Sequence, residues 1–183
     1  GPALVKAAIG QNVDLETLGG ARTHSSISGT SDYHELNDIA ALDRAKKILN
    51  NINYKKTFFL ERKKYREPQY PSIDYLSLFD PLKPDQYDMN EIIARIVDES
   101  IFSEFKKNYG KTILCGTSNL GGYPIGIVAN QRLIQKNELG HLEMGGVIYS
   151  DSADKAARFI MNCNQDRIPI LFIHDVNGFM VGK

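Results

Sequence analysis

The sequence predicts an α/β fold, and three features of its second half support that prediction. Residues 112–115 and 123–129 flank the Gly121-Gly122 turn and have the apolar composition of a β-hairpin. Residues 152–164 repeat small and apolar side chains at helical spacing, and residues 168–174 form an apolar run typical of a strand buried on both faces. A strand, a helix and a strand in this order form a parallel crossover unit.

The crossover helix is expected to begin at Asp151 or Ser152, since either side chain can cap a helix. His174, at the end of the apolar run, is expected to be a structural histidine with satisfied hydrogen bonds. The core-facing residues predicted for the helix are Ala153, Ala156, Ala157, Ile160 and Cys163.

The first half of the chain predicts helices. Short helices are expected at residues 2–8 and 14–18, and residues 23–28 indicate a short polar strand or loop. From Asp32, which is expected to act as a cap, apolar residues recur every three or four positions and predict an amphipathic helix that ends near Asn51.

Residues 54–84 mix basic, aromatic and proline residues without a sustained period, which is typical of a connection between two modules. Such a stretch can contact nucleic acid, but a solvated linker is the favoured interpretation because the whole chain is neutral. A further helix is expected over residues 89–97, and Phe102 and Phe105 are expected to continue its apolar stripe after a break near Ser100.

Composition narrows the classes of function. The chain has 183 residues, with 22 Lys and Arg against 22 Asp and Glu. A net charge of zero disfavours nucleic acid and anionic membranes as partners, because both require accumulated positive charge. The longest uncharged apolar stretch falls far short of the roughly 20 residues that span a bilayer. Cys115 and Cys163 are too few for a disulfide framework, so reduced thiols are expected.

The residue spacing does not match familiar phosphate-binding or metal-binding motifs. Gly110-Lys111-Thr112 lacks the glycine five residues before Gly110 that a phosphate-binding loop needs, and a strand rather than a helix is expected after it. The four histidines are far apart, so no metal site is predicted. Cys163 is expected in the core, and Cys115 is a candidate nucleophile only if a base lies beside it.

Residues 175–182 are different, because they follow the carboxyl end of a parallel strand, where α/β sheets place ligands. Glycines there let backbone N–H groups approach a substrate oxygen closely. A plain turn without chemistry explains the same residues equally well.

Six segments form an ordered pattern along the chain: residues 1–10, 18–24, 28–32, 93–98, 122–130 and 177–182. Together they resemble the β subunit of biotin-dependent acyl-CoA carboxylases, which carries the carboxyltransferase activity. The form Gly178-Phe179-Met180-Val181-Gly182 is more similar to the methylcrotonyl-CoA carboxylase branch than to the propionyl-CoA branch.

The resemblance implies a crotonase-like fold of ββα repeats. It implies that residues 1–75 are the C-terminal part of the N carboxyltransferase domain, that residues 76–84 are a linker and that residues 85–183 begin the C domain. The family's subunit is far longer, so the chain is expected to be a fragment that is inactive alone.

The implied reaction transfers CO2 from carboxybiotin to an acyl-CoA of the methylcrotonyl-CoA or propionyl-CoA type, with backbone donors rather than side-chain acids and bases. The implied active-site loop is Gly178, Phe179, Met180, Val181 and Gly182, through its backbone. The acyl-CoA site implied within residues 105–130 uses Tyr109, Gly116, Gly126 and Asn130. Two other classes stay open: a non-catalytic assembly subunit with the same fold, and a crotonase-type decarboxylase or hydratase.

The resemblance further implies biotin carried by a partner subunit or domain, a biotin carboxylase and biotin carrier as partners, and a homo-oligomer that is a hexamer at full length. No metal, nucleic acid or membrane is expected. The implied location is the cytoplasm in a bacterium or the mitochondrial matrix in a eukaryote. One departure stands out, because residues 131–145 are an extra segment within a stretch associated with acyl-CoA binding, which leaves the acyl preference open.

Overall fold

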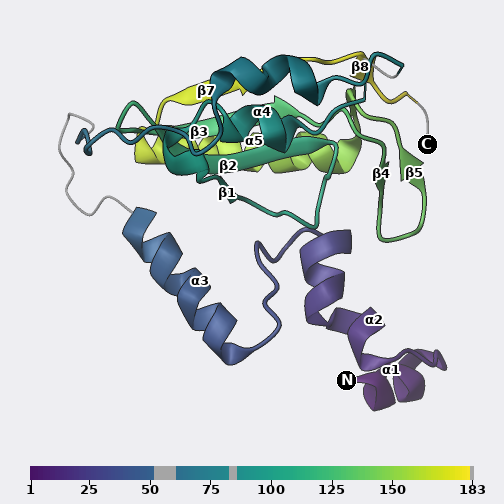
Figure 1. Cartoon of the computed structure of the whole chain (residues 1–183). Coiled ribbons are helices and arrows are strands. Elements are labelled where there is room, and N and C mark those ends of the chain that lie inside the picture. Colours follow the sequence, from purple (N-terminus) through teal and green to yellow (C-terminus); the bar gives the residue numbers. More distant parts are fainter. Residues whose placement is uncertain (52–60, 83–85, 182–183) are drawn as a thin grey trace.

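The computed structural model describes residues 1–51, 61–82 and 86–181. Its centre is a mixed four-stranded sheet with helices on both faces (Figure 1). The strands, in their order across the sheet, are β1 (Ser103–Glu104), β2 (Ile113–Leu120), β3 (Tyr123–Asn130) and β7 (Ile170–Ile173). Strands β1, β2 and β3 pair antiparallel, whereas β3 and β7 run parallel.

The predicted hairpin is confirmed, and β2 is longer than expected. Leu120 lies opposite Tyr123, and the two residues between them are Gly121 and Gly122, with φ of 60° and 84°. Positive φ at both central positions is the requirement of a tight hairpin turn that matches strand twist. The buried Asp98 carboxylate accepts hydrogen bonds from both glycine N–H groups at 2.8 Å, which ties the turn to the segment before β1.

The predicted parallel crossover is also confirmed, since α5 (Ser150–Asp166) connects β3 to β7. The helix begins earlier than expected, after Tyr149, whose N–H donates to the Ser152 hydroxyl at 2.8 Å. Its predicted core-facing set is wrong at Ala153 and Ala157, which are exposed. The buried residues of α5 are instead Ser152, Lys155, Phe159 and Cys163.

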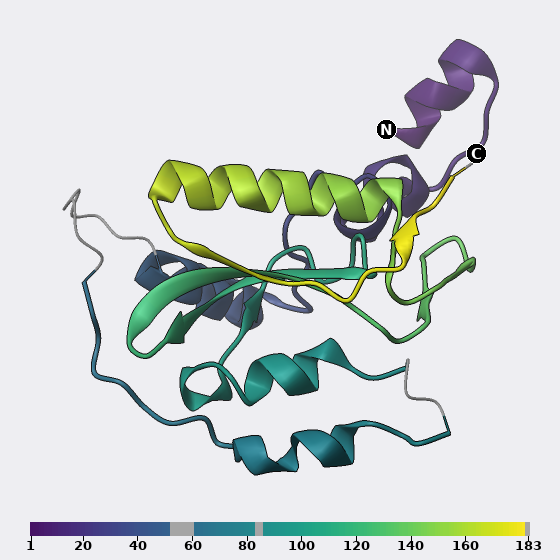
Figure 2. The ribbon, with the colours of Figure 1, turned by 90° about the horizontal axis from the view of Figure 1, so that it is seen from above.

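Two apolar clusters cover the two faces of the sheet. Figure 2 shows the sheet nearly edge-on, with α5 along one face and the helical segments near residues 72–78 and 89–94 along the other. The cluster on the α4 (Met89–Ala94) face contains Met89, Ile93, Val97, Leu114, Ile125, Ile127 and Ala129. The cluster on the α5 face contains Phe105, Ile113, Cys115, Val128, Phe159 and Cys163.

The predicted helix over residues 89–97 ends at Ala94, and a short 3-10 turn, Asp98–Ser100, follows. Strand β1 separates Phe102 from Phe105, so Phe102 packs against the cluster on the α4 face and Phe105 belongs to the other. The expected continuation of the helical stripe is therefore wrong.

Strand β7 is only partly buried. Phe172 is 48% exposed, and His174 beyond the strand is exposed. β7 pairs only with β3 in the four-stranded sheet and is therefore one of its two outermost strands. The prediction of a strand buried on both faces is therefore wrong for the described chain, and His174 does not lie in the core.

Four short strands lie at the edge of the sheet where β3 and β7 end. β4 (Gln135–Lys136) and β5 (Leu142–Glu143) form a small antiparallel hairpin within the extra segment. β6 (Val147–Ile148) pairs in parallel with β8 (Gly178–Phe179), which follows β7.

The first 51 residues form helices that lie outside the sheet (Figure 1). The expected helices at residues 2–8 and 14–18 are confirmed, and the Asp14 carboxylate accepts from the N–H of Thr17 at 2.9 Å. The expected strand or loop at residues 23–28 is wrong. The helical segments here are α1 (Pro2–Ile9), α2 (Leu15–Gly19), a π-helix (Thr23–Ile27) and α3 (Asp38–Asn51), and a 3-10 helix (Ser72–Leu78) follows later.

Helix α3 begins later than predicted, and its cap is not Asp32. The Asn37 side chain accepts from the N–H of Ala40 at 2.9 Å, whereas Asp32 pairs with Lys106 at 2.5 Å. Parts of the predicted connection, at residues 54–60 and 83–84, lie outside the described residues. In the described parts of the chain, no helix is both long and apolar enough to cross a bilayer.

A buried ion pair lies beneath α5. The Lys155 ammonium is fully buried and lies 3.3 Å from the Glu104 carboxylate. Burial lowers the pKa of Lys155 and raises the pKa of Glu104, so each charged form depends on the other.

We expect Glu104→Gln to lower the free energy of unfolding by about 3–5 kcal/mol, because it leaves a buried ammonium without its counter-charge. The double variant Glu104→Gln/Lys155→Met should recover most of that loss. Urea unfolding of the wild type, Glu104→Gln, Lys155→Met and the double variant measures this coupling. If the losses of the two single variants simply add in the double variant, the two side chains do not act as a pair.

Candidate functional site

The candidate site lies at the edge of the sheet where β3 and β7 end. Because these strands run parallel, the residues after Asn130 and the residues after Ile173 leave the same edge. Figure 1 shows β8 close to β4 and β5 there. We call residues 174–181 the edge loop.

The backbone of the edge loop is fixed by hydrogen bonds to the segment around β6. The N–H of Asn177 donates to the Gly146 carbonyl at 2.7 Å, and the N–H of Met180 donates to the Ile148 carbonyl at 2.8 Å. These two donors are used within the fold. Phe179 is 74% exposed and Val181 is 90% exposed, so the apolar side chains of the loop point away from this chain's core.

Gly178 is the one described glycine of the loop. Its φ is 152°, and a Cβ placed on it would meet no atom within 4 Å. The backbone here is therefore open to a ligand on the side where a side chain would project. Gly182, the second glycine of the predicted loop, lies outside the described residues.

A polar cluster anchors the start of the edge loop. The Tyr87 hydroxyl donates to Asp175 at 2.5 Å, and the Arg132 guanidinium lies 3.4 Å from the same carboxylate. Arg132 also donates to the Asn177 side-chain oxygen at 3.0 Å. Burial, followed by the hydrogen bond to Asp175, raises the pKa of Tyr87 well above its ordinary value. The sequence did not single out Tyr87 or Arg132, because neither belongs to a local motif.

A small apolar hollow lies beside this edge, between the sheet and α5. Its volume is about 160 Å³, and the polar residues that line it are Asn130 and His174. His174 lies at its margin, and its ring contacts Phe172 edge to face at 5.5 Å between centroids. The lining residues are Ile113, Val128, Ala129, Asn130, Ile148, Ala156, Ile160, Phe172 and His174.

The four residues predicted to bind acyl-CoA are not gathered in this hollow. Only Asn130 lines it, and its side chain is buried. Tyr109 is buried against Gly29, where a Cβ would lie 2.7 Å from the tyrosine ring. Gly116 packs against Phe102 and the Ser103 carbonyl.

Gly126 lies on the other face of the sheet from Gly116. A Cβ on Gly126 would lie 2.6 Å from Cys163 Sγ and 3.2 Å from the Phe159 ring. Close packing therefore accounts for both glycines without a ligand. Their assignment to acyl-CoA binding stays a prediction.

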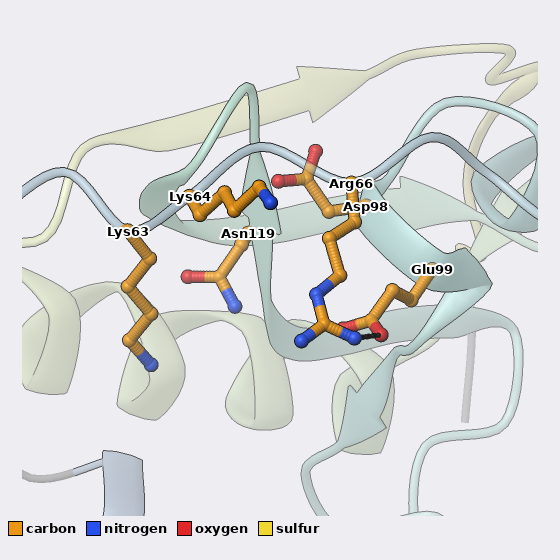
Figure 3. Close-up of a pocket in the computed structure, with 6 residues that line it drawn as sticks. All are labelled: Lys63, Lys64, Arg66, Asp98, Glu99 and Asn119. Carbon is orange, nitrogen blue, oxygen red and sulfur yellow. Dashed lines mark hydrogen bonds and ion pairs between the residues drawn. The ribbon is translucent and has the colours of Figure 1, made fainter.

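A second, charged hollow lies at the opposite end of the sheet, beside the β2–β3 turn (Figure 3). Its volume is about 270 Å³, and its lining residues are Lys63, Lys64, Arg66, Asp98, Glu99 and Asn119. Arg66 pairs with Glu99 at 2.8 Å, and the N–H of Lys63 donates to the Gly122 carbonyl at 2.8 Å. The Asp98 carboxylate is already used, because it accepts hydrogen bonds from the turn. We therefore interpret this hollow as the packing interface between residues 61–66 and the β2–β3 hairpin.

The cysteines show no sign of nucleophilic chemistry. Cys115 is fully buried, and burial raises the pKa of its thiol to about 12. Burial likewise raises the pKa of Cys163 to about 11. Among residues 1–51, 61–82 and 86–181, no three His, Cys, Asp or Glu side chains are grouped as a metal site.

Comparison with known proteins gives matches along the whole chain. Residues 1–183 match the carboxyl transferase domain family. The chain is 39% identical over 183 residues to the mitochondrial methylcrotonoyl-CoA carboxylase beta chain of Dictyostelium discoideum, and covers 29% of that protein. It is 39% identical over 186 residues to the biotin-dependent 3-methylcrotonyl-coenzyme A carboxylase beta1 subunit of Mycobacterium tuberculosis, and covers 32% of it.

Among solved structures, transcarboxylase 12S superposes on the whole chain with a TM-score of 0.80 at 30% identity. The match covers 34% of the transcarboxylase chain. This likeness confirms the predicted crotonase-like arrangement of ββα units. The chain thus spans about a third of the length of the proteins that it matches.

The packing around Gly126 yields a test. We expect Gly126→Ala to destabilise the protein by about 1–3 kcal/mol, since the added methyl group overlaps Cys163 Sγ. In a Cys163→Ala background the same change should cost clearly less, because the sulfur is gone. Thermal unfolding of the wild type, both single variants and the double variant decides this, and an equal cost in both backgrounds would contradict it.

Proposed function

The chain belongs to the carboxyl transferase domain family, and on that premise we propose that it is part of the carboxyltransferase subunit of a biotin-dependent acyl-CoA carboxylase. The observation that supports this most is the 39% identity to methylcrotonoyl-CoA carboxylase beta chains along the entire chain. We propose an acyl-CoA of the methylcrotonyl-CoA type, or a propionyl-CoA-like one, as the substrate.

In the proposed reaction, the bond between the carboxyl carbon and biotin N1′ breaks, and a new bond forms to the substrate carbon. That carbon gives up a proton, and biotin N1′ ends protonated. Biotin, delivered by a partner, supplies the transferable carboxyl group. Gly178 fits a bound biotin ring in this proposal. It has no side chain and no neighbour where one would project, so its backbone can lie close to the ring.

The edge loop contributes through its backbone in this proposal, because Gly178, Phe179, Met180 and Val181 have no side chain that transfers a proton. Fixed N–H dipoles stabilise negative charge that develops on a substrate oxygen. The hydrogen bonds at Asn177 and Met180 hold the backbone of the loop in place for this task.

We propose the domain division that the family resemblance implies: residues 1–75 end one domain, residues 76–84 are a linker, and residues 85–183 begin the next domain. The exposed apolar side chains of α1 and α3 support burial by further parts of the protein or by another copy. Transcarboxylase 12S assembles as a hexamer, and we propose a hexamer for the full-length protein. The Dictyostelium relative is mitochondrial, which supports a matrix location if this protein is eukaryotic. For a bacterial protein we propose the cytoplasm.

The proposal is tested with the full-length subunit, its biotin carboxylase and its biotin carrier. Given ATP, bicarbonate and a panel of short and branched acyl-CoAs, the assembly should form a carboxylated product with at least one of them. Absence of product across the panel would reject the enzyme and favour an assembly subunit. Release of CO2 from a carboxylated acyl-CoA without net carboxylation would favour a decarboxylase.

Asn130 lines the hollow beside the edge loop, and its contribution to acyl-CoA binding can be measured. We expect Asn130→Ala to raise the acyl-CoA Michaelis constant by about tenfold, the effect of one lost hydrogen bond. The Michaelis constant for free biotin should change little. Ser118→Ala is a matched control, because Ser118 is a buried polar residue on the same hairpin and donates to the Ile101 carbonyl. Equal effects on both constants would assign Asn130 to general stability.

Gly178 offers the sharpest test of the edge loop. We expect Gly178→Val to reduce carboxyl transfer by about a hundredfold, the scale of losing one well-placed oxyanion donor. Gly121→Val is the control, since Gly121 also has positive φ and no neighbour within 4 Å of its Cβ position, but lies at the other end of the sheet. If the Gly178→Val oligomer folds and its turnover stays near normal, the edge loop is a structural turn with no part in carboxyl transfer.

A further inference from the structure

The extra segment, residues 131–145, begins with two buried polar side chains. Gln131 Oε1 accepts from the N–H groups of Met89 at 3.2 Å and Arg132 at 2.8 Å. Its amide nitrogen donates to the Asp88 carboxylate, which caps α4, at 2.8 Å. These bonds fix the backbone of Arg132 against the start of α4.

From that fixed base, the side chain of Arg132 reaches the edge loop. Its Nη1 donates to the Asn177 side-chain oxygen at 3.0 Å and to the Asp175 carbonyl at 3.3 Å. Its Nε lies 3.4 Å from the Asp175 carboxylate. Arg132 therefore contacts the loop at two side chains and one backbone oxygen, although only 6% of the residue is exposed.

Two glycines make room for this guanidinium and its backbone. A Cβ on Gly145 would lie 1.9 Å from the Arg132 carbonyl oxygen, and a Cβ on Gly146 would lie 2.2 Å from Arg132 Nη1. Gly146 also supplies the carbonyl that accepts from the N–H of Asn177. Both ends of the extra segment therefore affect the edge loop: Arg132, near its start, contacts the loop directly, and Gly145 and Gly146, at its end, leave room for Arg132.

The edge loop depends on such polar contacts because its apolar residues do not anchor it. Phe179, Met180 and Val181 are exposed, and Gly178 has no side chain. A buried guanidinium is costly unless its donors are paired, so its pairing with the loop favours one loop conformation over others.

We propose that Arg132 is a positioning residue, which holds Asp175 and Asn177 and thereby fixes the backbone of residues 177–180 for carboxyl transfer. The role rests on the proposed function. Through Arg132, the extra segment would then support carboxyl transfer by positioning the edge loop, without contacting the substrate itself.

The test uses the full-length oligomer with Arg132→Met and Arg132→Lys. Arg95→Met is the matched control, because the Arg95 side chain is 9% exposed and pairs with Glu91 of α4 rather than with the edge loop. Hydrogen exchange is followed at the amides of Asn177 and Met180, with the amides of β2 and β3 as the reference for global folding. Carboxyl transfer is measured in parallel.

For Arg132→Met we expect exchange at the two loop amides to be roughly tenfold faster and kcat to fall roughly tenfold, the scale of losing a hydrogen bond to a charged group. Both Michaelis constants should stay within about twofold, because the binding surfaces are unchanged. Arg132→Lys should lie between wild type and Arg132→Met, since an ammonium keeps the charge but not the planar fork. Arg95→Met should leave loop exchange and kcat unchanged.

Unaltered loop exchange in Arg132→Met would overturn the proposal. Faster exchange with an unchanged kcat would also overturn it, because the contact would then not serve the reaction. Failure of the proposed function is visible separately, as the absence of carboxylated product with the wild-type assembly.

Discussion

The parallel register between β3 and β7 is the constraint on which the rest of the structure depends. Gly126 lies opposite Ile170, and Ala129 lies opposite Ile173, so both strands end at one edge. A parallel pair requires a crossover, and α5 provides it on one face. The same register brings the residues that follow β3 next to those that follow β7. Contacts between Arg132 and Asn177 are therefore a consequence of strand direction, across 45 positions of sequence.

Local signals predicted the parts of the fold that local physics determines. The Gly121-Gly122 turn requires positive φ, Asp14 caps the helix directly after it, and the apolar runs define the strands. The failures have a different origin. Helical spacing favours alanines rather than Lys155 on the inner face of α5, because a lysine is buried only where a partner exists. That partner, Glu104, is 51 positions away and carries no recognisable local signal.

The candidate site shows the same division. The edge loop could be located from the sequence, because it follows an apolar strand and contains glycines. Tyr87 and Arg132 could not, since they meet Asp175 only after β7 has docked on β3. The positions of Gly116 and Gly126 also required the structure. In sequence they are two glycines on neighbouring strands, but strand alternation places them on opposite faces, each beneath a different neighbour.

Residues 131–145 also contact the N-terminal helical region. The strength of this contact can be compared with that of the other contacts between the N-terminal region and the sheet. Glu138 in this segment pairs with Arg22 at 2.7 Å and Lys111 at 3.1 Å, and these hydrogen bonds lower its pKa. Arg22 is largely exposed, so that pair contributes at most about 1 kcal/mol.

The stronger connection is Lys106, which is buried and whose ammonium donates to the Gly29 carbonyl and pairs with Asp32, each at 2.5 Å. Loss of a buried, charge-assisted contact costs more than loss of an exposed one, because the remaining charge stays without a partner. The seam between the N-terminal helices and the sheet is therefore held chiefly by Lys106 and by the packing of Tyr109 on Gly29. The extra segment can then serve the edge loop without also having to hold the two halves together.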